Sequence, residues 1–166
     1  MDIFSFLHEG RIAYQRFDHP PVYTVADVHR LTPDLPGSPT KNLFLHDGRG
    51  RRHFLVVVQD LKRTDLKQLA RCLEVPRLTF ASADRLRRIL GVAPGAVSLL
   101  AVVNDLQKRV EVVIDAPLWS DCALQFHPLV NTSTLVIARP DLQRLLQRTG
   151  HAPRVIDVPA FGQKGA

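Results

Sequence analysis

The chain has 166 residues, which suits one domain with a substantial core. Hydrophobic residues make up 45% and charged residues 23%, a composition typical of globular proteins that excludes disordered and fibrous classes. The formal net charge is +6, from 22 Lys and Arg against 16 Asp and Glu, and this excess favours a polyanionic partner.

The sequence carries no signal for a membrane or for secretion. No uninterrupted apolar stretch approaches the roughly 18 residues of a membrane span, and the start, Met1-Asp2-Ile3, lacks the basic residues and apolar core of a secretory signal. Cys72 and Cys122 fit no metal or redox spacing, and Cys72 falls in a helical pattern as a buried side chain. We therefore expect a protein of the reducing cytoplasm with two structural cysteines.

The first half of the chain has the periodicity of short helices and strands. In order, the pattern predicts a helix over residues 2–9, a strand over 13–17, a helix capped by Thr24, a strand from Lys41 to His46 and a strand over 53–59. Asp47-Gly48 is a turn signal, so the last two strands are expected to form a hairpin.

The second half continues with helices and strands in irregular alternation. The pattern predicts helices capped by Thr64 and Ser82, strands over 99–103 and 109–114 that pair with each other, strands over 123–127 and 134–137, a helix opened by Pro140 and a strand over 154–158, with Trp119 in an undefined connection. Hairpins among helices favour a mixed sheet over a doubly wound parallel one. We expect a single compact α/β domain over residues 1–158 and a loosely ordered tail over 159–166.

Lys41 and Asn42 stand where the apolar run Leu43-Phe44-Leu45 begins. Lys41 is either a solvated residue at a strand end, with its stem on apolar surface, or a cation that reaches into a cleft and binds an anion or a carbonyl. Because lysines are mostly exposed, the residue alone favours the first interpretation.

Two later stretches are ambiguous in the same way. The loop Gly91-Val92-Ala93-Pro94-Gly95 is either a helix C-cap with a turn or a place where backbone amides face an oxyanion. His127, before Pro128 and the Asn131-Thr132 turn, is either a turn former or an imidazole at the rim of a cleft. The seven histidines form no metal-binding spacing, and no Gly-x-Ser-x-Gly elbow is present.

The three stretches occur in a recognisable order. They are Lys41-Asn42-Leu43-Phe44-Leu45, then Gly91-x-x-Pro94-Gly95 with Val97-Ser98 and Asn104-Asp105, then Phe126-His127-Pro128-x-x-Asn131-Thr132-x-Thr134. With them the chain resembles the YbaK/ProX family of aminoacyl-tRNA deacylases and is similar to the insertion editing domain of many bacterial prolyl-tRNA synthetases. The resemblance covers most of the chain, from about Asp18 to Pro153, and favours the free-standing ProX type. Leu99-Leu100 departs from the Pro-Phe pair expected there, so the sequence does not determine which residues form the pocket wall.

The resemblance implies a fold, a reaction and a set of roles. The fold is a mixed, strongly curved, barrel-like sheet with flanking helices, and the reaction is hydrolysis of the ester between an amino acid and the tRNA 3′-terminal ribose, without metal or cofactor. The implied catalytic residues are Lys41 on the terminal phosphate or the ester carbonyl, backbone amides near Gly95 on the oxyanion, and His127 on the substrate. Asn42, Gly91, Pro94 and Asn131 are implied substrate contacts. No general base is evident, and a ribose hydroxyl of the substrate is a candidate for placing the water.

Selectivity and tRNA binding complete the expected site. Val22, Val25 and Val28 are stiff β-branched residues that either line a small pocket, with Lys41 and His127 at its mouth, or form an ordinary helix face in the core. Arginines on the hairpin and before the glycine loop are either tRNA contacts or a solvated charged face; they are Arg49, Arg51, Arg52, Arg77, Arg85 and Arg88.

The sequence therefore predicts a trans-editing hydrolase that deacylates mischarged tRNA(Pro), foremost alanyl-tRNA(Pro). Two alternatives stay open: a cysteinyl-tRNA(Pro) deacylase of the YbaK subgroup, and a nucleic-acid-binding module without catalysis. Prolyl-tRNA synthetase is a candidate second partner, and the sequence does not determine the oligomeric state.

Overall fold

The computed structural model describes residues 2–32 and 34–162. The helices are α1 (Ile3–Glu9), α2 (Val25–Leu31), α3 (Leu66–Cys72), α4 (Ala83–Leu90), α5 (Ala116–Trp119) and α6 (Arg139–Thr149), with 3-10 helices η1 (Pro94–Ala96) and η2 (Leu99–Asn104). The strands are β1 (Gln15–Asp18), β2 (Ser38–His46), β3 (His53–Gln59), β4 (Thr79–Phe80), β5 (Val110–Asp115), β6 (Ala123–Phe126), β7 (Ser133–Ala138) and β8 (Arg154–Ile156).

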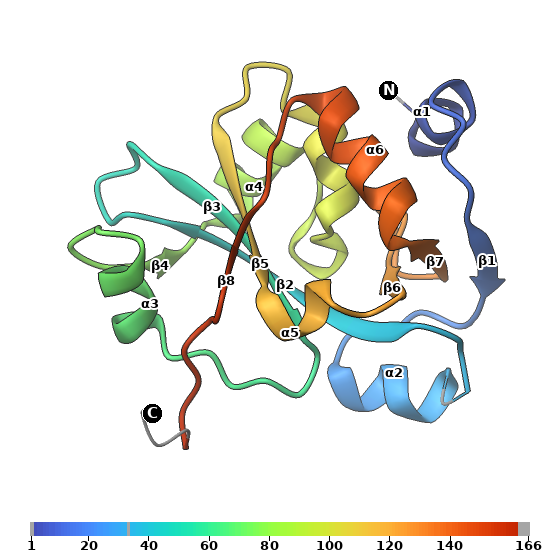
Figure 1. The fold of residues 1–166 in the computed structure, drawn as a ribbon, viewed down its shortest axis with the longest axis horizontal. Helices are drawn as coiled ribbons and strands as arrows, with labels where there is room; N and C mark the ends of the chain where they lie inside the picture. The colour runs from blue at the N-terminus through green and yellow to red at the C-terminus, as the bar shows by residue number, and fades with distance from the viewer. Residues whose placement is uncertain (1, 33, 163–166) are drawn as a thin grey trace.

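Strand β2 joins the two halves of the sheet and crosses the middle of the molecule (Figure 1). Its start pairs in parallel with β6 through Ser38 and Pro39, and its remainder pairs antiparallel with β3 from Thr40 to His46. The strand order is β1-β7-β6-β2-β3-β5-β8, with β4 paired to β2. Because β1 and β8 lie at opposite ends of this order, the mixed sheet is open rather than a closed barrel.

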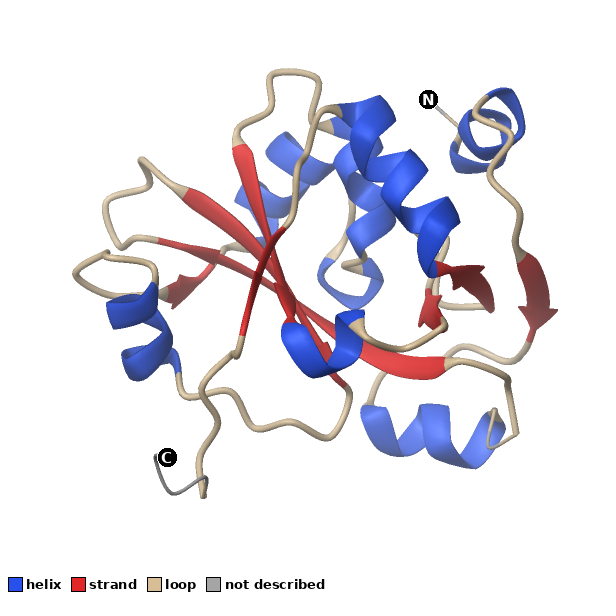
Figure 2. Cartoon of the chain, viewed as in Figure 1, coloured by secondary structure: helices blue, strands red, loops and turns tan. Residues whose placement is uncertain are grey.

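The sheet separates two apolar cores because side chains alternate along a strand. Phe44 of β2 and Leu55 of β3 belong to the larger core, which α1, α4, η2 and α6 cover. Leu43 and Leu45 belong to the smaller core against α3. Figure 2 shows α3 apart from the other helices, beside the sheet. The expected single α/β domain with a curved mixed sheet is confirmed.

Most element predictions are confirmed, and the caps explain why. The Thr24 side chain accepts a hydrogen bond from Asp27 N, and the Ser82 side chain accepts one from Arg85 N. The predicted hairpin is present, with a turn in which Asp47 Oδ1 accepts from Arg49 N and Arg51 N. The cap of α3 is Asp65 rather than Thr64, because the Asp65 carboxylate accepts from Gln68 N.

The predicted strand over residues 99–103 is wrong. This segment is η2, which begins with the Ser98 hydroxyl accepting from Leu100 N, and its five apolar side chains are all buried. A short apolar run buried on every side has the same sequence pattern in a helix and in a strand. Residues 110–115 therefore pair with β3 and β8 instead.

The structure also places the two cysteines, Trp119 and the start of the expected tail. Cys72 and Cys122 are both exposed, so neither is a buried structural cysteine. Trp119 ends the short helix α5, which Pro117 helps to start. At the start of the expected tail, Pro159 accepts from Asp65 N and Phe161 N donates to Arg63 O, while residues 163–166 lie outside the described part, so the domain boundary stays a prediction.

Candidate active site

A cavity of about 370 Å³ opens over the middle of β2. The strand segment Thr40–Phe44 forms its base, residues 22–25 and Val28 form one side, and β4, α4 and η1 form the other. The lining residues are Val22, Tyr23, Thr24, Val25, Val28, Thr40, Lys41, Asn42, Leu43, Phe44, Asp60, Phe80, Ala81, Leu86, Pro94, Gly95, Val97 and His127. Eight of the residues predicted for the site are in this set.

Lys41 is half-buried in the cavity, and its ammonium donates a hydrogen bond to the Lys62 carbonyl. Lys62 is itself fixed, because its Nζ lies 2.7 Å from Asp115 Oδ2 in a buried ion pair. Burial lowers the pKa of Lys41 below its usual value, and the negative charge of Asp60 opposes that shift. An ammonium has three N–H groups, so Lys41 keeps donors for a ligand while one holds the side chain in place.

Asp60 follows β3, the strand that pairs with the Lys41 strand, and its carboxylate is buried in the cavity wall. His29 Nε2 of α2 lies 2.7 Å from Asp60 Oδ2. Burying an acidic side chain is costly unless cations or donors face it, and both His29 and Lys41 are near. Sequence reasoning missed Asp60; its place one residue past a buried strand was the available signal.

One ring nitrogen of His127 donates to a backbone carbonyl, and the other can accept a hydrogen bond from a ligand. Its Nδ1 lies 2.9 Å from the Ser133 carbonyl, and because a carbonyl only accepts, Nδ1 carries the proton and Nε2 is the acceptor in the neutral ring. Burial lowers the pKa of His127, the bond to Ser133 opposes this, and nearby His19 adds to the lowering. The His19 and His127 rings are 6.0 Å apart. His127 is thus neutral near pH 7.

Asn42 supports the glycine loop from below. Its Oδ1 accepts from Leu99 N at 2.9 Å, at the start of η2, and its Nδ2 donates to Thr40 Oγ1 at 3.3 Å. Thr40 Oγ1 in turn donates to the Gln125 carbonyl at 2.6 Å. The Asn42 side chain therefore fixes the position of the segment that follows Gly95, in addition to lining the cavity.

Gly95 and Pro94 lie at the cavity edge, whereas Gly91 does not line it. A Cβ built on Gly95 would meet no atom within 4 Å, so open space faces its backbone. Gly91 ends α4 in the left-handed conformation with φ 66°, and a Cβ there would lie 3.0 Å from Asn104 Nδ2. The structure gives Gly91 the role of a helix cap, and not the predicted contact with the cavity.

The three valines line the cavity, and Asn131 holds one of them, Val22, from outside it. Helix α2 has no buried residue, so Val25 and Val28 face the cavity rather than a packed core. Val22 N donates to Asn131 O at 3.1 Å, and Asn131 Nδ2 donates to Val22 O at 3.0 Å. Asn131 thus positions the Val22 wall instead of lining the cavity as predicted.

The unexpected Leu99-Leu100 pair lies away from the cavity. Both side chains are fully buried in the larger core, and neither lines the cavity. The wall on this side comes instead from Val97, Leu86 and Ala81.

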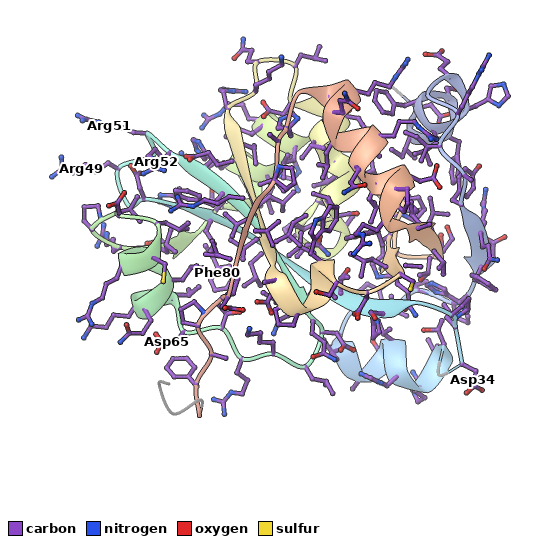
Figure 3. The ribbon with its side chains drawn as sticks, in the orientation of Figure 1. Asp34, Arg49, Arg51, Arg52, Asp65 and Phe80 are labelled. Carbon is purple, nitrogen blue, oxygen red and sulfur yellow. The ribbon has the colours of Figure 1, made fainter. Side chains whose placement is uncertain are left out.

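The predicted arginines divide into held and outward-facing side chains. Arg52 contacts both carboxylate oxygens of Glu111, at 2.9 and 2.8 Å, and Arg85 Nη1 donates to His53 Nε2 at 2.8 Å. Arg77 and Arg85 pack over Gly48 and Gly50 of the hairpin turn, so they lie there and not at the glycine loop. Arg88 is exposed on α4, and Figure 3 shows Arg49 and Arg51 extending outward at the turn.

Neither a metal-binding cluster nor a membrane-spanning helix occurs in the part of the chain that the structure describes. Across residues 2–32 and 34–162, no group of three or more His, Cys, Asp or Glu side chains is arranged to hold a metal ion. In the same residues no helix is long and apolar enough to cross a membrane.

Comparisons with known proteins agree on one family. The family described as "Aminoacyl-tRNA editing domain" matches residues 19–145. The "Prolyl-tRNA editing protein ProX" of Acetoanaerobium sticklandii is 35% identical over 156 residues, covering 94% of this chain and 95% of the relative. The "Prolyl-tRNA synthetase associated domain-containing protein 1" of Danio rerio is 35% identical over 154 residues, covering 92% and 83%.

A solved structure has the same fold. It is described as a candidate trans-editing enzyme for prolyl tRNA synthetase and superposes with a TM-score of 0.70 at 19% identity, covering 95% of this chain and 94% of that one. The sequence match from residue 19 to residue 145 includes Lys41, Gly95 and His127, which the cavity brings together. The chain belongs to the aminoacyl-tRNA editing domain family.

Proposed function

We propose that this protein hydrolyses the aminoacyl ester of mischarged tRNA(Pro) in trans, with alanyl-tRNA(Pro) as the main substrate and the cytoplasm as its compartment. The observation that carries the proposal is one cavity in which Lys41, His127 and the open edge at Gly95 meet three valine side chains. The editing-domain membership and the ProX relative support the choice of substrate.

The chemistry requires little beyond positioning and charge. An aminoacyl ester is already activated, so the site must orient a water molecule and stabilise the oxyanion that forms at the carbonyl. Lys41 supplies a compact cation to the terminal phosphate or the ester carbonyl. The backbone N–H of Gly95, a cavity-lining residue without a side chain, supplies a neutral donor for the oxyanion, whereas Ala96 N already donates to Ala93 O.

His127 binds the substrate as a neutral acceptor. With Nδ1 committed to Ser133, Nε2 accepts a hydrogen bond from a ribose hydroxyl, which in turn places the attacking water. Asn42 acts on the same geometry by fixing the start of η2. No step uses a metal, and we expect full activity after exhaustive chelation; loss with chelator and recovery with zinc would overturn this part.

Selectivity follows from size. A synthetase pocket shaped for proline rejects smaller alanine weakly, because missing methylenes sacrifice only about 1–3 kcal/mol. A second site that admits only the smaller residue corrects this. The cavity also has to hold the terminal ribose, so the filter acts locally at Val22, Val25 and Val28, whose branched side chains have few rotamers.

The test is deacylation of alanyl-, cysteinyl- and prolyl-tRNA(Pro) by the purified protein. We expect fast cleavage of the alanyl ester and sparing of the prolyl ester, with Val25→Ala relaxing the filter toward larger residues. Val155→Ala, an exposed valine on β8, is the matched control. Equal cleavage of all three rules out the filter, preference for the cysteinyl ester assigns the YbaK subgroup, and binding without cleavage leaves a nucleic-acid-binding module. Adding prolyl-tRNA synthetase to the assay tests it as a second partner.

A further inference from the structure

Two large aromatic side chains stand exposed at the edge of the cavity. Tyr23 is 76% exposed and Phe80 is 58% exposed, and both are among the lining residues. Tyr23 precedes α2 on one side of the cavity, and Phe80 belongs to β4 on the other. We call these two side chains the aromatic rim. Neither residue belongs to a basic stretch of the sequence.

The backbone under Tyr23 is firmly held although its ring is exposed. Val22, one residue before, makes two hydrogen bonds with Asn131, and Tyr23 N donates to Asp27 Oδ2 at 3.0 Å. Thr24, one residue after, caps α2. The ring therefore moves only about its own two side-chain torsions, and ordering it on a ligand costs little entropy.

Phe80 is held in the same way from the opposite side. It pairs with Leu45 in the short antiparallel contact between β4 and β2, and the next residue, Ala81, donates from its N–H to the Phe44 carbonyl at 3.0 Å. The Phe80 ring belongs to neither apolar core, so core packing within the described residues does not explain why a large apolar side chain stands there.

The chemistry of the substrate indicates what covers these rings. The ester that Lys41 and His127 address is attached to the last ribose of the tRNA. The terminal base is attached to the same ribose, so it lies next to the cavity. The last nucleotides of a tRNA are unpaired, and an unpaired base presents a flat π-face that stacks on aromatic side chains irrespective of its sequence. The excess of positive charge on the protein favours this polyanionic end over an apolar peptide.

We propose that the aromatic rim stacks on the unpaired 3′-terminal bases of the substrate tRNA, the terminal adenine foremost. This inference rests on the proposed function, because it takes the ester of an aminoacyl-tRNA as the occupant of the cavity. Tyr23 and Phe80 thereby fix the terminal nucleoside while Lys41 and His127 address the ester.

The first test exchanges aromatic for aliphatic side chains. Tyr23→Leu and Phe80→Leu keep apolar bulk but remove the π-face, and we expect each to lower kcat/KM on alanyl-tRNA(Pro) by roughly 5- to 150-fold, the range for one lost stacked base. Tyr23→Phe and Phe80→Trp should keep activity near wild type. Leu106→Ala, at an exposed apolar side chain outside the cavity, is the control for general surface effects.

The second test removes the amino acid and isolates the rim. Binding of a CCA trinucleotide, measured by titration calorimetry, needs no ester hydrolysis, so it reports on stacking even if the protein deacylates nothing. We expect both leucine variants to bind it more weakly and both aromatic variants to bind it like wild type. Unchanged CCA binding in the leucine variants would overturn the stacking inference but not the proposed deacylase function. Weaker CCA binding in these variants, together with no deacylation by wild type, would overturn the proposed function alone.

The third test uses the 3′-O-alanyl ester of 1-O-methylribose, which keeps the ribose hydroxyl that the proposed mechanism uses but has no base. The leucine variants should lose much less kcat/KM on this ester than on alanyl-tRNA(Pro), because no base is present to stack. An equal loss on this ester and on alanyl-tRNA(Pro) would mean that the substitutions disturb the cavity, and would overturn the stacking role.

Discussion

His127 and His151 are the same residue type in opposite settings. His127 lines the cavity with Nδ1 bonded to a backbone carbonyl and Nε2 left as an acceptor. His151 is fully buried, and its Nε2 lies 3.0 Å from Asp105 Oδ2. That same carboxylate oxygen accepts from Val110 N at 2.8 Å. The pair thus connects the end of η2, the start of β5 and the end of α6.

The difference shows that a histidine's partners, rather than its neighbours in sequence, decide its role. Both residues stand beside a turn signal in the sequence, His127 before Pro128 and His151 after Gly150. Only His127 combines a partner that fixes its ring with a nitrogen that a ligand can reach. We expect substitutions around His127 to change activity with little effect on stability, and substitutions around His151 to do the reverse.

The largest expected effect is on the cavity side, at Lys41. Lys41→Ala removes the cation that we propose for the oxyanion or the phosphate, and the loss of such a group lowers kcat by about 10²–10³-fold. The melting temperature should change little, since Lys41 is only half-buried and its one bond is to a carbonyl. Single-turnover deacylation and thermal melting check the two parts. Turnover near wild type would return Lys41 to the class of solvated strand-end lysines.

The next effect is on stability, at His151. His151→Ala leaves the buried Asp105 carboxylate without its imidazole partner, and removing one member of such a pair costs at least about 2 kcal/mol. Urea unfolding measures this, and deacylation at low temperature should stay near wild type. His127→Ala is the matched variant, expected to lose activity while costing about 1 kcal/mol or less. Equal destabilisation by His151→Ala and His127→Ala would contradict the assignment of a structural role to His151 and a catalytic role to His127.

This contrast also marks what the sequence could predict. The caps at Thr24 and Ser82, the hairpin turn and the assembly of Lys41, Gly95 and His127 follow from local patterns and from the family resemblance. Residues 99–103 could not be assigned, because complete burial removes the periodicity that separates helix from strand.

Long-range partners were likewise beyond the sequence. Gly91 matches the motif but serves as a helix cap, and Asn131 positions Val22 from outside the cavity. Asp60 and the aromatic rim became visible only when the fold brought distant segments to the same cavity. A residue's type and spacing indicate its chemistry, but its partners come from strand pairing between residues far apart in the chain.

A moderate effect is expected on the pH profile. Burial holds the pKa of His127 below its usual value of about 6.5, and the proposed mechanism needs the neutral ring. Activity should therefore be flat near pH 7 and fall on acidification, by about tenfold for each pH unit below the depressed pKa. Rates are measured after subtraction of spontaneous ester hydrolysis. An acid limb with its midpoint above 6.5 would contradict a neutral, buried His127.

The smallest expected effect extends the comparison to arginines at the hairpin turn. Arg51 is exposed and makes no ion pair within the described residues, whereas its neighbour Arg52 is held by Glu111 and lies over the Phe54 ring at 5.0 Å. If Arg51 contacts a tRNA phosphate, Arg51→Ala should raise KM by roughly two- to fivefold at low salt and reduce the slope of log affinity against log salt by about 1. The effect should disappear at high salt because the released counterions no longer favour binding.

Arg11→Ala is the control for this prediction, since Arg11 is exposed, makes no ion pair within the described residues and follows α1, which Figure 1 shows away from the hairpin. The same change in KM and salt slope for both variants would mean that net charge alone attracts the tRNA. A change confined to Arg51 would place the tRNA backbone along the turn that joins β2 to β3, the strand pair that also carries Lys41. Because Arg52 is already neutralised by Glu111, its substitution should lower stability more than affinity. Arg51 and Arg52 would then differ as His127 and His151 do: one residue is available to a ligand, and the other is paired within the protein.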